Sequence, residues 1–447
     1  MSRVPAPELL SPAGTLKAMR HAFAYGADAV YAGQPRYSLR VRNNEFDHAR
    51  LAQGIAEAQA AGKRFYVVVN IAPHNAKLRT FLKDLEPVVA MGPDALIMSD
   101  PGLIMLVRQH FPHIPVHLSV QANAVNWASV KFWQQQGLSR VILSRELSLD
   151  EIEEIRREVP EMELEVFVHG ALCMAYSGRC LLSGYLNHRD PNQGTCTNAC
   201  RWQYGATPAA EDELGQLMPA LGCGSPSERL FLLEEANRPG EAMSAWEDEH
   251  GTYIMNSKDL RAIHHVERLA RAGVHSLKIE GRTKSHFYVA RTAQAYRRAI
   301  DDAVAGRPFD RALMDDLESL ANRGYTEGFL RRHVHDEYQN YEHGYSLAER
   351  HQFVGEFTGV VRHGLAEVRV KNHFAVGDRL QLMTPGGNLD FRLEALENRF
   401  GERHAVAPGD GHLLYLPLPA DADLENALLL RWFSTGQNSR QPRAQAL

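Results

Sequence analysis

The sequence predicts an α/β fold, a (β/α)8 barrel of the TIM type, followed by a small antiparallel β-barrel domain. The first 280 residues repeatedly alternate a short apolar run with an amphipathic helical stretch. The first run leads into SPAGTLKA, which lacks the glycine-rich phosphate fingerprint of an open dinucleotide-binding sheet. From about residue 351 the pattern changes to alternating apolar and polar residues separated by turns such as PGG and APGDG.

Eight runs of apolar and β-branched residues, each ending in small or polar residues, are the predicted barrel strands. They span residues 8–11, 29–32, 65–70, 95–99, 117–121, 141–144, 165–169 and 276–280. Helices with apolar residues at helical spacing are predicted over 15–25, 50–61, 76–91, 127–136 and 148–159, with a further helical region over 283–322. Glycines at 62, 92 and 137 suit helix C-terminal caps. Eight strands alternating with helices favour a closed barrel.

The alternation is interrupted between the seventh and eighth strands. Residues 170–255 form an insertion that contains all five cysteines. It follows the carboxyl end of a barrel strand, where barrels carry their active sites, so we expect it to cap the barrel mouth. The predicted organisation is a barrel domain over 1–325, a connector over 326–350, the β-barrel over 351–434 and a disordered polar tail over 435–447.

The composition is that of an ordinary globular protein, with 44% hydrophobic and 23% charged residues among 447. The N-terminus has no apolar signal region, and no apolar run approaches the length of a membrane span. We therefore expect a cytoplasmic protein. A net charge of −5 argues against a generic polyanion binder, although a local basic patch can still bind nucleic acid.

Four cysteines, Cys173, Cys180, Cys196 and Cys200, are clustered in the insertion. In a cytosolic protein, clustered thiols are more often metal ligands or catalytic groups than structural disulfides. Their spacing differs from the paired C-x-x-C of a zinc ribbon and suits either tetrahedral zinc or an iron–sulfur cluster. Buried apolar cysteines and a redox or nucleophilic thiol are the alternatives.

Several long motifs resemble the collagenase-like peptidase family, peptidase family U32. They are HGALCMAYSGRC, LSGYL, NQGTCTNACRW and SLKIEGRTKS, together with the N-terminal ELLSPAG, ADAVYAG and YSLR. The resemblance extends from about residue 5 to residue 435. The motifs EDEHGTYIMNSKDLRAI, GYTEGFLRRH and FVGEFTG are similar to the tRNA-hydroxylation branch of the family. That branch implies prephenate-dependent 5-hydroxylation of the wobble uridine of tRNA, which is the first step toward 5-carboxymethoxyuridine.

The resemblance also implies a four-iron four-sulfur (4Fe–4S) cluster. Family members that act in ubiquinone hydroxylation hold such a cluster on four cysteines, and three ligand positions match Cys173, Cys180 and Cys196. Their fourth ligand lies near residues 255–256, where this chain has Met and Asn. We take Cys200 as the fourth ligand, because it lies one helical turn after Cys196 if that segment is helical, and Cys223 as the alternative.

Prephenate, a dicarboxylate, needs cations in its binding site. Arg145 ends the sixth strand, and Lys278 and Arg282 lie at the end of the eighth, where barrel enzymes place functional groups. Gln121, on the fifth strand, is a further candidate for binding substrate. The alternative is a structural ring of ion pairs in which Arg145 and Lys278 join the acidic residues 146 and 280.

Two residues are candidates for acid–base catalysis, His169 at the end of the seventh strand and Glu280 at the end of the eighth. A histidine satisfied by neighbours at the barrel mouth is an equal alternative for His169. Weaker polar candidates are Asn123 on the fifth strand and Arg36 and Arg40 after the second.

For the tRNA anticodon loop, the RRHVH run at 331–335 and the tyrosines 338, 341 and 345 offer cations and stacking surfaces. We also expect the C-terminal β-barrel to dock tRNA, by fold-level analogy. Two alternative functions stay open. One is a collagenase-like protease, for which the sequence has neither H-E-x-x-H nor G-x-S-x-G but does contain His169 near Cys173. The other is a non-catalytic tRNA-binding or assembly factor with a structural metal.

Overall fold

The structure is a computed structural model that describes residues 4–34, 36–39, 45–172, 258–320, 322, 324–331, 351–419 and 422–433. Between 204 and 252 it describes the backbone of five strands. All five cysteines lie outside the described residues, as do Arg40, residues 332–335 and the three tyrosines expected to contact tRNA.

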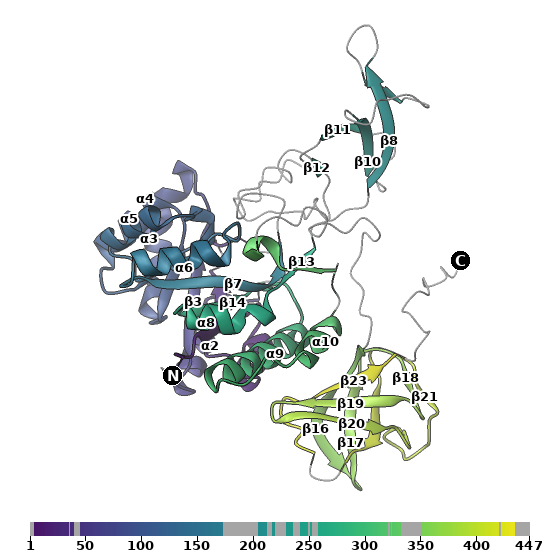
Figure 1. Ribbon diagram of the computed structural model, residues 1–447. Helices are drawn as coiled ribbons and strands as arrows, with labels where there is room; N and C mark the ends of the chain where they lie inside the picture. The colour runs from purple at the N-terminus through teal and green to yellow at the C-terminus, as the bar shows by residue number, and fades with distance from the viewer. Residues whose placement is uncertain are drawn as a thin grey trace.

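Eight parallel strands close into a barrel, which confirms the predicted fold (Figure 1). The order is β14-β1-β2-β3-β4-β5-β6-β7, and β7 pairs again with β14. The strands are β1 Glu8–Pro12, β2 Ala29–Gly33, β3 Arg64–Val69, β4 Ala95–Met98, β5 Val116–Leu118, β6 Arg140–Ile142, β7 Glu163–Ala171 and β14 Ser276–Ile279. Their carboxyl ends gather on one face, which is the barrel mouth.

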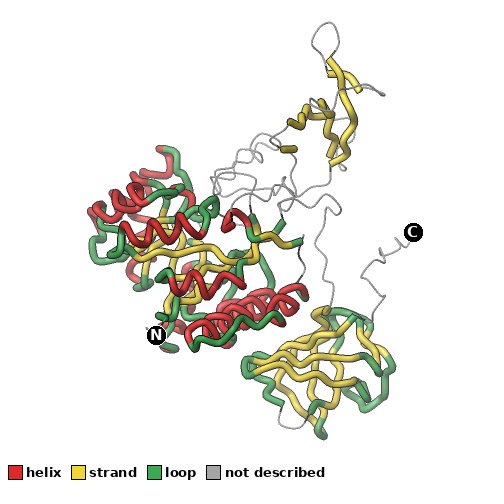
Figure 2. Tube along the Cα trace, viewed as in Figure 1, coloured by secondary structure: helices red, strands yellow, loops and turns green. Residues whose placement is uncertain are grey.

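Helices surround the strands, as the red and yellow tubes of Figure 2 show. They are α1 Leu16–Ala24, α2 His48–Ala60, α3 Asn75–Ala90, α4 Pro101–His110, α5 Trp127–Gln135, α6 Leu149–Glu158, α8 Val266–Arg271, α9 His286–Val304 and α10 Ala312–Glu318. Side chains accept hydrogen bonds from the first turn of several helices, for example Thr15 at α1 and Asp100 at α4. Ser148 and Glu151 form a reciprocal capping box at α6. No helix in the described part of the chain is long and apolar enough to cross a membrane.

The structure departs from the sequence expectation next to β5 and beyond β7. The fifth strand was expected to reach Gln121 but ends at Leu118, and Val120–Ala122 form a 3-10 turn, η1, that ends at Asn123 with φ of 54°. Two short strands, β13 Asp259–Arg261 and β15 Tyr325–Thr326, extend the sheet beyond β7. Strands of three and two residues are too short to leave a periodic signal in the sequence.

Within the insertion, the described backbone forms a separate antiparallel sheet in the order β12-β11-β10-β8-β9. Its strands are β8 Tyr204–Glu211, β9 Leu217–Pro219, β10 Arg229–Glu235, β11 Ala242–Asp248 and β12 Gly251–Thr252. The chain leaves the barrel after β7 and returns at β13, beside the last residues of β7. The insertion is therefore attached at the mouth of the barrel.

The C-terminal domain consists of strands and loops, and its antiparallel character is confirmed (Figure 2). Six strands pair in the order β20-β19-β23-β16-β17-β22, and β18 pairs with β21. Their bounds are β16 His351–Arg362, β17 Leu365–Val370, β18 Phe374–Ala375, β19 Arg379–Thr384, β20 Gly387–Arg392, β21 Val406–Ala407, β22 Leu413–Pro417 and β23 Leu428–Trp432. Two backbone hydrogen bonds between Glu397 and Tyr415, of 2.9 and 2.7 Å, join the chain after β20 to β22 and so link the two edges of the sheet.

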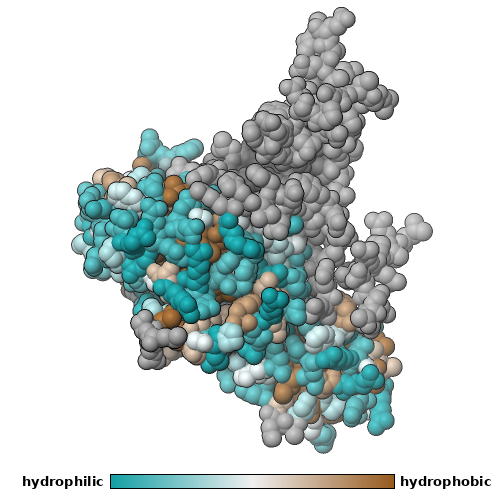
Figure 3. Space-filling view, viewed as in Figure 1, coloured by the Kyte–Doolittle hydropathy of each residue, from teal (hydrophilic) through white to brown (hydrophobic). Residues whose placement is uncertain are grey.

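The barrel and the C-terminal domain share a packed interface along α1 and α9. The Tyr25 hydroxyl donates to the carbonyl oxygen of Met383, at 3.0 Å. Arg291, fully buried on α9, donates to Gln381 Oε1 on β19, at 2.9 Å. Met383, together with Leu428 and Leu430 of β23, belongs to the same hydrophobic cluster as the barrel core. On the face seen in Figure 3 the side chains of the two parts meet.

Gly170, near the end of β7, has φ of +106°, and a Cβ atom added there would lie 2.5 Å from the carbonyl oxygen of Glu280. We expect Gly170→Ala to lower the free energy of unfolding by about 3–4 kcal/mol, because backbone strain adds to a clash with backbone. The matched control is Gly306→Ala. Gly306 has φ of +68° with nothing within 4 Å of the added atom, so we expect a loss of about 1 kcal/mol. Equal losses in urea unfolding would contradict the close approach of β7 and Glu280.

Candidate active site at the barrel mouth

A network of buried charges runs through the inside of the barrel. Lys278 on β14 and Glu165 on β7 are both buried, and their Nζ and Oε1 atoms lie 2.6 Å apart. Arg140 on β6 also contacts Glu165, at 3.2 Å, and continues the network to Glu8, at 2.6 Å, and Glu163, at 2.8 Å. Barrel interiors are usually filled with branched apolar side chains, so this charged interior is a distinctive feature.

Lys278 is the residue of this network nearest the mouth, and aromatic rings surround its ammonium group. Its Nζ atom lies 4.4 Å from the ring centroid of Tyr31 and 5.4 Å from that of Phe167. Burial lowers the pKa of Lys278, and the Glu165 carboxylate opposes that shift. The Tyr31 hydroxyl donates to the carbonyl oxygen of Ile279, at 2.8 Å, which fixes the Tyr31 ring against β14.

Two arginines lie over the same pair of rings. The Arg145 guanidinium is 3.9 Å from the Phe167 ring centroid, and the Arg282 guanidinium is 5.9 Å from that of Tyr31. Arg282 also donates from Nη2 to the carbonyl oxygen of Leu39. The structure therefore brings together the three cations that the sequence singled out, Arg145, Lys278 and Arg282, on an aromatic floor.

Gln121 belongs to a polar group that follows β3 and β5. Its Oε1 atom accepts hydrogen bonds from Asn70 Nδ2, at 3.0 Å, and from the Ser119 hydroxyl. Asn70 is itself fixed, because its Oδ1 atom accepts from the backbone N–H of Leu39, at 3.0 Å. Leu39 thus connects this amide group to Arg282, which donates to its carbonyl oxygen.

His169 faces the helices rather than the inside of the barrel. Its ring packs against Tyr288 and Tyr296 of α9 and against Tyr325, with ring centroids 5.5–5.9 Å apart. Its Nδ1 atom lies 3.4 Å from the Tyr296 hydroxyl. Burial lowers the pKa of His169 to about 3. The histidine is therefore neutral at physiological pH and shielded from solvent.

The remaining sequence candidates occupy different places. Glu280 is half-buried directly after β14, and its carbonyl oxygen accepts from the Tyr288 hydroxyl at 2.7 Å. Arg36 forms a surface ion pair with Asp84, at 2.6 Å. The sequence also allowed a structural ring of ion pairs at the mouth that included Lys278 and Glu280. In the structure Lys278 pairs with Glu165, inside the barrel. Asn123 ends η1, and its buried Oδ1 atom has no hydrogen-bond partner among the described residues.

Sequence reasoning missed Glu165, Phe167 and Tyr31 as members of the site. A signal was present in ELEVFVHG, where Glu163, Glu165 and Phe167 recur at every second position of a strand. Side chains at alternate positions share one face of a strand, and in a closed barrel one of those faces is the interior. Acidic residues on that inner face require cationic partners, and those partners are Arg140 and Lys278.

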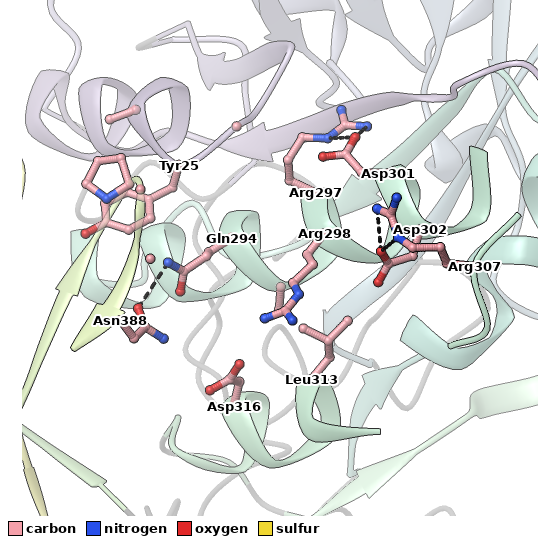
Figure 4. Close-up of a pocket in the computed structure, with 16 residues that line it drawn as sticks. Tyr25, Gln294, Arg297, Arg298, Asp301, Asp302, Arg307, Leu313, Asp316 and Asn388 are labelled. Carbon is pink, nitrogen blue, oxygen red and sulfur yellow. Dashed lines mark hydrogen bonds and ion pairs between the residues drawn. The ribbon is translucent and has the colours of Figure 1, made fainter. Parts of the chain in front are cut away.

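A separate pocket of about 660 Å³ lies between the barrel and the C-terminal domain (Figure 4). It is lined by the end of α1, by α9 and by the β19–β20 turn, and Gln294 donates to Asn388 across it at 3.2 Å. Arg297 and Asp301 pair at 2.7 Å, as do Arg307 and Asp302. The pocket lies toward the amino ends of the strands, away from the mouth, and these paired charges do not favour an ionic ligand.

Comparison with known proteins identifies the family. The model of peptidase family U32 matches residues 14–340, and the model of the peptidase family U32 C-terminal domain matches residues 349–431. The chain belongs to this family, as the motifs around the cysteines indicated.

Curated relatives specify the branch. The chain is 70% identical to tRNA hydroxylation protein P of Escherichia coli K12, over 98% of this chain and 99% of that protein. It is 66% identical to tRNA hydroxylation protein P of Haemophilus influenzae, over 98% of each. A 23S rRNA 5-hydroxycytidine synthase of Escherichia coli is 28% identical over 93% of this chain and 57% of that protein. The expected similarity to the tRNA-hydroxylation branch is confirmed.

The charged interior gives a stability test. We expect Lys278→Met to lower the free energy of unfolding by about 3–5 kcal/mol, because it leaves the buried Glu165 carboxylate with only the longer Arg140 contact. The double variant Glu165→Gln with Lys278→Met removes both charges and should recover most of that loss. Urea unfolding of the two proteins measures the difference. A double variant no more stable than Lys278→Met would contradict the pairing.

His169 gives a pH test. Its pKa is about 3 in the fold and about 6.5 when unfolded, so its contribution to stability is complete above pH 6.5 and is lost as pH falls toward 3. Between pH 7 and pH 5 the loss from this residue should be about 2 kcal/mol. We expect His169→Phe, which keeps an aromatic ring, to reduce the pH dependence of the unfolding free energy by that amount. The other buried histidines are common to both proteins and cancel, so unchanged pH dependence would contradict a buried neutral His169.

Proposed function

We propose that this chain is a tRNA-modifying enzyme that carries out prephenate-dependent 5-hydroxylation of the wobble uridine, giving 5-hydroxyuridine. The observation that carries the proposal is the convergence of Arg145, Lys278 and Arg282 on the rings of Tyr31 and Phe167 at the mouth. The names of the curated relatives support RNA hydroxylation as the reaction class.

Prephenate has one carboxylate on its cyclohexadiene ring and a second on the pyruvyl side chain of the same ring carbon, and the mouth offers a complementary group to each part. Arg145 and Arg282 are suited to bind the carboxylates, because a guanidinium can donate two parallel hydrogen bonds to one carboxylate. The ring would pack against Tyr31 and Phe167. Glu165 holds the Lys278 ammonium in place and offsets its charge, and the guanidinium groups of Arg145 and Arg282 are the further cations beside the two rings.

Polar groups around this anion site would orient the other reactant. Gln121 is held by Asn70 and Ser119 and would hydrogen-bond a polar edge of a base or of prephenate. Glu280, half-buried at the end of β14, is our candidate proton acceptor. His169 is enclosed by three tyrosines just before the cysteine segment, so positioning the backbone at the end of β7 suits it better than proton transfer.

We further propose a 4Fe–4S cluster bound by Cys173, Cys180, Cys196 and Cys200, with zinc as the alternative metal. The donor set fits, since four thiolates suit either metal, and Cys173 directly follows Leu172 at the mouth. When bound, the cluster would supply electron transfer. The wobble base would have to leave the stack of the anticodon loop to reach the mouth, as enzymes that modify bases require.

The test is a reconstituted assay. The full-length protein is purified without oxygen, its visible spectrum and iron content are recorded, and 5-hydroxyuridine in tRNA is measured with and without prephenate. We expect Arg145→Gln and Arg282→Gln to raise the prephenate concentration for half-maximal activity by at least about tenfold each, the loss of one charged hydrogen bond. Arg36→Gln, which removes a surface arginine paired with Asp84, is the matched control and should leave it unchanged.

Other outcomes separate the alternatives. A protein that contains zinc only would contradict the cluster, and normal hydroxylation by Cys173→Ser would contradict a role for it in the reaction. Binding of tRNA without hydroxylation would indicate an assembly factor with a structural metal. Cleavage of casein or gelatin that is lost in Cys173→Ser would indicate the protease.

A further inference from the structure

A second group of potential metal ligands lies outside the barrel mouth. His264 and His265 are the last two residues of η5, Ile263–His265, immediately before α8. Glu327 follows β15 and precedes η6, Gly328–Arg331. The two segments come together because β15 pairs with β13, which leads into η5. This His264–His265–Glu327 cluster therefore joins residues far apart in the sequence, on the extension of the sheet beyond β7.

The three side chains direct ligand atoms at a common point. Nε2 of His264 lies 2.9 Å from one carboxylate oxygen of Glu327, and Nε2 of His265 lies 3.0 Å from the other. All three residues can offer ligand atoms within 4.8 Å of one another. Ligand atoms about 2.0–2.2 Å from one ion are separated by about 3 Å, so this spacing suits coordination of a single metal.

One observation distinguishes the cluster from an ordinary ion pair. Both ring nitrogens of His264 are inaccessible to solvent, and neither has a hydrogen-bond partner among the described residues. Nε2 of His264 is close to Glu327 but out of line for a hydrogen bond, whereas Nε2 of His265 is well placed for one. A buried polar atom without a partner costs about 1–3 kcal/mol, and a metal bound at Nε2 would satisfy it.

The charges and burial are compatible with this interpretation. Both imidazoles are largely buried beside Glu327, with side chains 25% and 12% exposed for His264 and His265. Arg331 donates to both oxygens of Glu327. A carboxylate has about four lone-pair sites, so the arginine leaves acceptor capacity for an ion. Arg331 balances the charge of Glu327, but it gives the buried ring nitrogens of His264 no hydrogen-bond partner.

We propose that His264, His265 and Glu327 bind a divalent first-row transition-metal ion of the Zn²⁺ or Fe²⁺ class. Two imidazoles and one carboxylate form a ligand set that such ions accept, with the remaining positions open to water. The ion would tie the start of α8 to the segment that leaves the barrel after β15. The site contains no cysteine and is independent of the proposed iron–sulfur cluster.

The probe is Co²⁺ alone, added to the full-length protein purified without oxygen. Wild-type protein is expected to bind one equivalent with the weak visible bands of nitrogen and oxygen ligation and without a thiolate charge-transfer band, which excludes the cysteines as ligands. His265→Ala and Glu327→Gln are each expected to weaken this binding at least about 100-fold, since even loss of an outer-shell partner costs 10–100-fold. Zn²⁺ should compete for the same site.

Two variants serve as controls. Glu318→Gln removes a carboxylate that is likewise paired with an arginine, Arg261, but that forms no ion pair with a histidine in the described part of the chain, and it should leave Co²⁺ affinity unchanged. Arg331→Gln removes the cation that shares Glu327 and should tighten Co²⁺ binding. Circular dichroism checks that each variant is folded. Absence of nitrogen- and oxygen-ligated Co²⁺ in both wild type and Arg331→Gln, or equal affinity in His265→Ala, would overturn the proposal.

Discussion

Pairing of buried charge inside the barrel is the constraint on which the rest of the site depends. Arg140 and Lys278 are both buried, and each would be strongly destabilising without its carboxylate partners. Arg140 connects Glu8 of β1 to Glu165 of β7, and Lys278 joins Glu165 from β14. This pairing fixes the relative positions of β1 and β7, the two strands on either side of β14 where the barrel closes. The same pairing holds an ammonium group beneath the aromatic rings of the mouth.

The barrel could be predicted from sequence because its signal is repeated. Eight apolar runs alternate with helices, and misplacing the end of one run does not change the predicted fold. The fifth strand shows the limit, since Gln121 was placed on the strand but lies in η1. A three-residue strand followed by a short 3-10 turn has no distinctive pattern. β13 and β15 are shorter still, and their places in the sheet come from pairing with β7 and with each other.

The sequence indicated which types of side chain form the site, but it did not indicate which of them contact one another. The sequence suggested Glu280, two positions further along the chain, as an ion-pair partner of Lys278, but its partner is Glu165 on another strand. His169 was expected at the mouth because it ends the predicted seventh strand. The register between β7 and β14 shifts after Lys278, so that Ile279 pairs with His169, and the histidine packs against α9 instead. Neither pairing nor a bulge between distant strands can be read from local sequence.

The interface along α9 decides whether the barrel can be expressed without the C-terminal domain. The two family models meet between residues 340 and 349, which invites expression of the barrel alone. Such a fragment would lose the hydrogen-bond acceptors of Tyr25 and the Gln381 partner of buried Arg291, and it would expose apolar surface that Met383 covers. The evolutionary modules are thus not independent cooperative units. A barrel whose buried Arg291 keeps Asp316 but loses Gln381, and whose apolar surface is uncovered, is a candidate for aggregation rather than for a minimal enzyme.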